Sequence, residues 1–405
     1  MKKIAIYIAL IFFCTIDAQK KKTENTANFE LGSGLNFSFE DNNYRFTIGG
    51  FLQPAYTYSK ITDKKGTNEL NVQRAYFSLG GKAVKEKISF FIQTDFSLSQ
   101  PLLDAWLAYH PTENISITAG QKRTPLNNKE MNINESQFQF TERSLLSTSL
   151  TNTGREFGLF ADGRFQLGSF GIIPQLAMTS GDGRNSFGSN SRDTDRGGLK
   201  YGARLDLYPL GFFSEGNEEA IADLLHEPNL RIAAGAAASY NKGVSSPVGE
   251  GHGDFSLYDA GQKLKYPDYR KFYADLLLKY KGFSLLGEYA NANATALDGI
   301  YTNQTATDLL RPQQISSYLV LGDAYNVQLG YVTLNGWAAD LRYSRISPEF
   351  KDFENSVMKD VSAYTLGLTK YIKGNNLKIQ AAVSSLQYTG DINELKADLV
   401  FQIVF

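Results

Sequence analysis

The chain has 405 residues, with 41 basic and 42 acidic side chains and a formal net charge of −1. This balance gives no sign of a nucleic-acid-binding protein, and one cysteine excludes a disulfide framework or a thiolate metal site. The 27 Phe, 23 Tyr and 36 Gly residues point to many short, aromatic-rich segments.

The first residues have the form of a secretory signal. Two lysines precede a short apolar run over residues 4–13, and Ala18 offers a small residue before a cleavage site. The run is too short to cross a bilayer as a helix. We therefore expect residues 1–18 to be removed on export, together with the sole cysteine, Cys14.

Residues 19–43 are rich in polar side chains, including three consecutive lysines and several asparagines. We expect them to form a flexible periplasmic lead-in, with Phe37 and Phe39 near the membrane surface. The rest of the chain, residues 44–405, contains no linker and no internal repeat, so it is predicted to be one domain.

From residue 44 onward, apolar side chains alternate with polar or small ones in short segments. A tilted strand of about 10 residues crosses a bilayer, and this alternation gives it one apolar and one polar face. Trp337 and Leu341 would face lipid, while Asp340 and Arg342 face inward. Such a charged face is costly in a solid apolar core but not in a water-filled lumen. The pattern therefore predicts a transmembrane antiparallel β-barrel.

About 16 strands are predicted, an even number, as a single-chain bacterial barrel with both ends in the periplasm requires, and Ile315–Leu321 is an alternative candidate for part of another strand. Their ranges are 44–58, 69–81, 87–98, 102–110, 114–122, 154–166, 170–181, 199–208, 229–240, 269–281, 283–292, 324–334, 336–345, 361–373, 376–388 and 396–405. Periplasmic turns are then short and extracellular loops long. The connection 209–228 is an exception, because it is long where a short turn is due, and it could hold a small helix. The predicted aromatic girdles include Tyr109, Trp337, Tyr343 and Tyr371.

The last predicted strand ends at Phe405, the final residue. A C-terminal aromatic residue on an alternating strand is typical of barrels that the outer-membrane assembly machinery recognises. We therefore expect the protein in the outer membrane of a Gram-negative bacterium, in contact with lipid and lipopolysaccharide.

Several segments resemble the phosphate-selective porin O and P family. They are Val72–Gly81, Ala119–Pro125, Phe140–Ser144, Gly154–Gly158, Ala338–Ser344 and Tyr364–Leu368. The similarity extends over roughly residues 44–405. It implies a barrel of 16 strands, usually assembled as a homotrimer, in which the third extracellular loop, residues 123–153, folds into the lumen.

Selectivity in such a pore is set by its bore and by charged side chains at the narrowest point. The third loop and its flanks contain Lys122, Arg123, Lys129, Arg143 and Arg155, and the strands place Arg74, Arg204 and Arg342 inward. A planar guanidinium can give two hydrogen bonds to a phosphate or carboxylate. The alternative is that these cations pair with nearby acids and only fix the loop to the wall. The acids there are Glu130, Glu135, Glu142 and Glu156.

These residues predict passive diffusion of small hydrophilic solutes with a weak, phosphate-like anion preference. Two alternatives stay open: an adhesion or binding barrel that acts through its extracellular loops, and a substrate-specific uptake channel. An enzyme is disfavoured, because His110, His226 and His252 fall on three different connections. We therefore assign no catalytic residue, cofactor or metal.

Overall fold

The computed structural model describes residues 25–40, 42–185, 197–251, 253–351, 353–390 and 392–405. The secretory signal predicted over residues 1–18 lies outside this part of the chain. Strands dominate the described residues, and none of their helices is both long and apolar enough to cross a bilayer.

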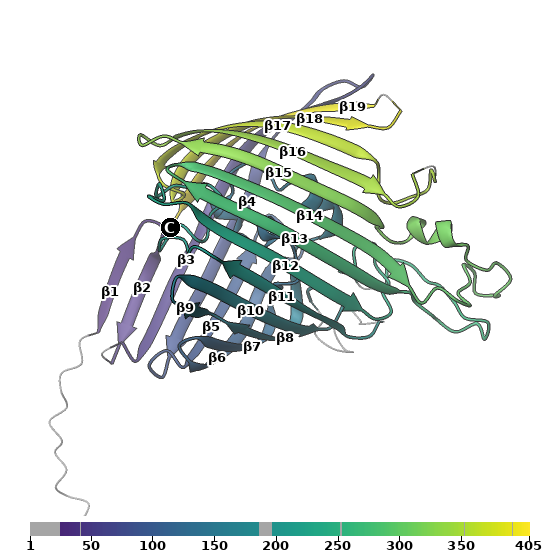
Figure 1. Cartoon of the computed structure of the whole chain (residues 1–405), viewed down its shortest axis with the longest axis horizontal. Helices are drawn as coiled ribbons and strands as arrows, with labels where there is room; N and C mark the ends of the chain where they lie inside the picture. The colour runs from purple at the N-terminus through teal and green to yellow at the C-terminus, as the bar shows by residue number, and fades with distance from the viewer. Residues whose placement is uncertain (1–24, 41, 186–196, 252, 352, 391) are drawn as a thin grey trace, which may run out of the picture.

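Sixteen of the described strands form a closed antiparallel barrel (Figure 1). They are β3 Tyr44–Ile61, β4 Thr67–Ala83, β5 Ile88–Asp95, β6 Leu102–Thr112, β7 Ile115–Arg123, β8 Arg155–Gly163, β10 Phe170–Thr179, β11 Lys200–Tyr208, β12 Arg231–Asn241, β13 Asp268–Tyr280, β14 Phe283–Thr295, β15 Gly322–Val332, β16 Trp337–Pro348, β17 Val361–Lys373, β18 Leu377–Tyr388 and β19 Asn393–Val404. A short strand, β9 Phe165–Leu167, continues the line of β8 beside β10. The last strand closes the barrel by pairing with the first, for example Val400 with Ala55. The predicted strand number is confirmed, and each predicted range overlaps an observed strand.

The two faces of the wall follow the predicted alternation. On β16, Ala338, Asp340 and Arg342 are buried, whereas Trp337 and Leu341 are exposed on the outside. A soluble protein would bury such a set of large apolar side chains, but a barrel can expose it to lipid. The outward faces of Tyr109 and Tyr343 agree with the predicted girdles.

The prediction is wrong for Tyr371, which is 5% exposed and faces the lumen. Tyr371 has the same parity along β17 as Thr365 and Thr369, which are also buried. Since side chains on a strand alternate between its faces, all three must point inward. Inside the barrel Tyr371 packs in an apolar cluster with Ala222.

The N-terminal lead-in is not flexible over its described part. It forms an antiparallel hairpin of β1, Thr26–Glu30, and β2, Gly34–Phe39, and β2 pairs with the first residues of β3. Figure 1 shows the hairpin projecting beside the start of β3 at the end of the barrel that carries the C-terminus. The hairpin therefore adds two strands to the wall outside the closed ring.

Candidate functional site

The third extracellular loop, residues 124–154, contains three short helices. They are α2 Lys129–Asn132, the 3-10 helix η1 Glu135–Gln137 and α3 Leu145–Leu150. The side chain of Asn134 accepts a hydrogen bond from the Ser136 amide at the start of η1, and Ser144 accepts one from Ser147 at the start of α3. Asn and Ser are favoured at such positions because they satisfy amides that the helix leaves free. The loop is therefore compact enough to fit inside the barrel.

Hydrogen bonds join the middle of this loop to the opposite wall. Gln139 donates from Nε2 to Oδ1 of Asp340 on β16 at 2.6 Å. On β18, Lys378 donates to the backbone carbonyl of Phe138 at 2.8 Å. The predicted inward fold of the third loop is thus confirmed, and the loop crosses the full width of the lumen.

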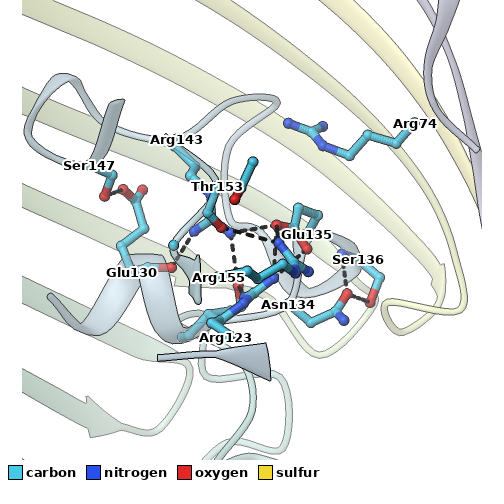
Figure 2. Close-up of polar contacts among 12 residues, drawn as sticks. Arg74, Arg123, Glu130, Asn134, Glu135, Ser136, Arg143, Ser147, Thr153 and Arg155 are labelled. Atoms are coloured by element: carbon cyan, nitrogen blue, oxygen red, sulfur yellow. Dashed lines mark hydrogen bonds and ion pairs between the residues drawn. The ribbon is translucent and has the colours of Figure 1, made fainter. Parts of the chain in front are cut away.

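Three arginines converge on Glu135 at this level (Figure 2). Arg123 Nη2 lies 2.8 and 2.7 Å from the two carboxylate oxygens, Arg143 Nη2 lies 2.7 Å from Oε1, and Arg155 Nη1 lies 3.5 Å from the same oxygen. Arg123 and Arg155 face each other across the β7–β8 pair. Like charges in that position repel each other unless a counter-charge lies between them. We call Arg123, Arg143, Arg155 and Glu135 the arginine cluster.

The arginine cluster carries excess positive charge. Burial by itself raises the pKa of Glu135, but Arg123, Arg155 and Arg143 outweigh it and hold that pKa well below its usual range. The carboxylate is therefore ionised at neutral pH. Asp104 adds a second negative charge, with Oδ2 2.9 Å from Arg155 Nε. Three guanidiniums against two carboxylates leave a formal charge of 3 − 2 = +1.

Two further arginines that the sequence predicts in the lumen, Arg74 and Arg342, lie beside the arginine cluster, and each forms an ion pair with one glutamate. Arg74 Nη2 is 2.9 Å from Glu142 Oε2, and Figure 2 shows Arg74 set apart from the cluster. Arg342 donates to the Glu142 carbonyl at 2.8 Å and lies 3.4 Å from Glu130 Oε1. These contacts connect the third loop to β4 and β16. They agree with the alternative interpretation, in which the basic residues pair with acids and fix the loop to the wall.

Lys122 and Lys129 lie outside the arginine cluster. Lys122 Nζ is 3.2 Å from Asp162 Oδ2 on the adjacent strand. Lys129 Nζ lies 3.5 Å from the Tyr208 hydroxyl oxygen and over that ring. The basic residues of the third loop and its flanks are therefore divided among separate places in the lumen.

Arg204 forms its own buried ion-pair group. Its guanidinium makes two contacts with Asp206, at 2.9 and 2.6 Å, and two with Asp275, at 2.9 and 2.8 Å. It also donates to the Asn127 carbonyl at 2.9 Å. Asp206 and Asp275 more than balance this guanidinium, and nearby Lys129 offsets the remaining negative charge, so Arg204 does not add to the excess positive charge of the arginine cluster.

The long periplasmic connection 209–228 also folds into the lumen. Its described backbone forms turns rather than the small helix considered for it. On β13, buried Lys279 donates to the carbonyls of Ala220 at 2.7 Å and Ala222 at 3.2 Å. Phe213 and Ile221 of this connection join an apolar cluster with Ile133 and Phe138 of the third loop. Two inward segments, one from each end of the barrel, therefore meet inside it.

Other extracellular loops cover part of the barrel mouth. Leu146 and Leu150 of α3 share a large buried cluster with Val244, Leu257 and Ile300 from two other loops. Glu250 Oε2 accepts hydrogen bonds from the backbone amides of Thr153 at 3.1 Å and Gly154 at 3.2 Å. This packing closes the mouth on the side of β12–β17.

A cavity of about 360 Å³, which Leu145, Ala363 and Leu386 line in part, lies between the third loop and strands β16–β19. Its lining includes Thr141, Thr148, Thr365, Ser384, Lys396 and Asp398. Arg143 of the arginine cluster and Arg342 also line it. Hydroxyl groups and paired charges therefore surround the space above the loop on this side.

Comparisons with known proteins agree with this architecture. The family model described as phosphate-selective porin O and P matches residues 46–211, which confirms the resemblance there. OmpF of Salmonella typhi, in complex with daunomycin, is 13% identical, with 93% of this chain and 100% of that chain covered and a TM-score of 0.51. The outer membrane channel DcaP of Acinetobacter baumannii is 13% identical, with coverages of 90% and 98% and a TM-score of 0.52. OprB of Pseudomonas putida is 12% identical, with coverages of 90% and 95% and a TM-score of 0.52.

At these identities the solved structures establish the fold alone. The search of curated proteins found no match. The family match and the barrel together identify an outer-membrane channel of a Gram-negative bacterium.

Proposed function

We propose that the chain is a porin through which small hydrophilic solutes diffuse passively, with a weak preference for anions. The observation that carries this proposal is the arginine cluster, in which three guanidiniums share Glu135 in the middle of the lumen. An excess positive charge at a narrow point attracts anions and repels cations. The preference is weak, because Asp104 and Glu135 neutralise most of that charge.

The narrow lumen supports a second candidate, a solute-selective uptake channel. The third loop and the connection 209–228 meet in one apolar cluster inside the barrel, and this cluster narrows the lumen there. A hydroxyl-lined cavity beside the arginine cluster would then favour solutes that combine hydroxyl groups with an anionic group. Saturable transport distinguishes this candidate from simple diffusion.

The assembly partners belong to the same proposal. We infer a homotrimer from the family that the sequence resembles, with lipopolysaccharide around the extracellular half. Recognition of Phe405 by the assembly machinery is consistent with its place at the periplasmic end, where its amide and carbonyl pair with Gly50.

Single-channel recording on the purified protein in a planar bilayer tests the proposal. We expect measurable conductance and a mildly anion-selective reversal potential in a potassium chloride gradient. Block by millimolar or lower phosphate would favour the solute-selective candidate. A folded protein without any conductance would contradict both candidates and favour the adhesion barrel.

A further inference from the structure

The outward face of the β1–β2 hairpin continues the lipid-facing surface of the barrel. Cross-strand pairing places Phe37 opposite Phe46, Phe46 opposite Gly81, and Gly81 opposite Phe90. The row ends on the barrel at Leu107, which is 57% exposed to the outside. A second row runs through Phe29, Leu35, Ile48, Leu79 and Ile92. Both rows hold only apolar residues or glycine.

The opposite face of the hairpin continues the polar inner surface. Asn36 is paired with Thr47, whose hydroxyl donates to Asn36 Oδ1 at 2.7 Å. Asn28 on β1 and Ser38 on β2 lie on the same face. Together with Asn36 and Thr47 they line a cavity of about 590 Å³. The hairpin is therefore two-sided in the same sense as the transmembrane wall.

Aromatic rings on the outward face form a continuous series. Phe37 and Phe39 have ring centroids 6.5 Å apart, Phe39 and Phe46 6.1 Å, and Phe46 and Phe90 6.1 Å. Phe29 on β1 is 62% exposed. Aromatic side chains are typical of the level at which a barrel meets the lipid headgroups.

The hairpin is fixed at its tip, so it cannot turn this face away from the barrel surface. The Gly32 amide donates to the Val404 carbonyl at 3.1 Å. The Asn376 side chain donates to the Leu31 carbonyl at 3.1 Å. The tip is therefore bound both to the end of β19 and to the β17–β18 turn.

We propose that the outward face of the β1–β2 hairpin binds phospholipid of the inner leaflet of the outer membrane. Its apolar rows are continuous with a surface that already faces lipid, whereas its polar face borders the periplasmic mouth of the lumen. The hairpin thus extends the lipid-contacting wall beyond the point where β19 ends. This inference depends on the barrel lying in a membrane, but not on which solute it passes.

Single-tryptophan variants test the proposal in vesicles of brominated phosphatidylcholine, whose bromine atoms quench tryptophan on contact. The native residues Trp106 and Trp337 are replaced by Phe, and Phe37→Trp is introduced. The matched control is Asn36→Trp, the neighbouring position on the polar face. A protein that retains only Trp337, which is exposed on the outside of the barrel, is the positive control.

We expect quenching of the Phe37→Trp variant to approach that of Trp337 and to exceed that of the Asn36→Trp variant severalfold. Equal, weak quenching of both hairpin variants, with access to aqueous iodide, would place the face in water and overturn the proposal. Protection of the Phe37→Trp variant from both quenchers would overturn it in favour of contact with a second copy of the chain. Phe39→Trp provides a second probe, and heat-dependent gel migration verifies that each barrel is folded.

Discussion

Replacing Glu135 by glutamine removes the carboxylate that three guanidiniums share while keeping the shape of the side chain. The substitution changes the formal charge beside the pore by one unit. For an ion that passes about 6 Å from this side chain, one unit charge changes the ion's energy by about 0.7 kcal/mol in water and about 3 kcal/mol at an effective dielectric constant of 20. The smaller value suits a hydrated lumen and corresponds to about a threefold change in the permeability of each ion, in opposite directions for chloride and potassium.

We therefore expect Glu135→Gln to increase the ratio of chloride to potassium permeability about tenfold, because chloride gains and potassium loses about a factor of three each. The reversal potential in a potassium chloride gradient measures this ratio directly. Glu113→Gln is the matched control, because it makes the same charge change on an exposed residue of a periplasmic turn. An unchanged reversal potential in a folded, conducting Glu135→Gln channel would show that ions do not pass the arginine cluster, and would refute the reasoning.

Three other measurements follow from the same structure. The low pKa of Glu135 means that its stabilising contribution is present above its unfolded pKa of about 4.3 and is lost as pH falls through the folded pKa. The effect of Glu135→Gln on ion selectivity should therefore be the same at every pH from 7 to about 4.5, and a change in the size of that effect would contradict this. Replacing the connection 209–228 by a short glycine-containing turn should raise single-channel conductance, whereas equal conductance would show that the connection does not limit the bore. Arg204→Met should lower the free energy of unfolding in urea by about 3–5 kcal/mol, because it leaves two buried carboxylates unpaired, and a loss below about 1 kcal/mol would contradict that explanation.

The strands could be predicted from the sequence because lipid and water impose opposite demands on alternate side chains. The alternation of Trp337, Asp340, Leu341 and Arg342 gives both the strand and its inward face. The hairpin carries the same signal, since Leu35 and Phe37 alternate with Asn36. That signal is short, and neither strand of the hairpin is long enough to cross a bilayer. The sequence alone therefore indicates only a polar lead-in there.

The pairing of the lumenal cations could not be predicted, because it depends on where the third loop lies in space. Arg123 and Arg155 stand at the two ends of that loop, and only the β7–β8 register brings them to Glu135. The inward fold of residues 209–228 did leave a trace in the sequence. Phe213 and Ile221 are apolar residues in a connection that would be polar if it lay in the periplasm.

Strand β3 receives two partners along the same edge, and this arrangement bears on how the barrel closes. Residues 44–48 pair with β2, a neighbour in sequence, whereas residues 51–61 pair with β19. The second pairing includes the hydrogen bond from Gln53 to Gln402, which are 349 residues apart in sequence. Local pairing forms faster than pairing over such a distance.

We therefore expect the hairpin to form before the last strand pairs, and its position beside β3 then limits how far β19 can extend. Phe405 exchanges backbone hydrogen bonds with Gly50, immediately beyond the segment of β3 that β2 occupies. A slip of β19 by two residues toward the periplasm would preserve its inward and outward faces but would collide with β2. A slip of one residue would turn its charged face to lipid. The hairpin thus excludes the two-residue shift of β19, which the alternation of inward and outward side chains alone would allow.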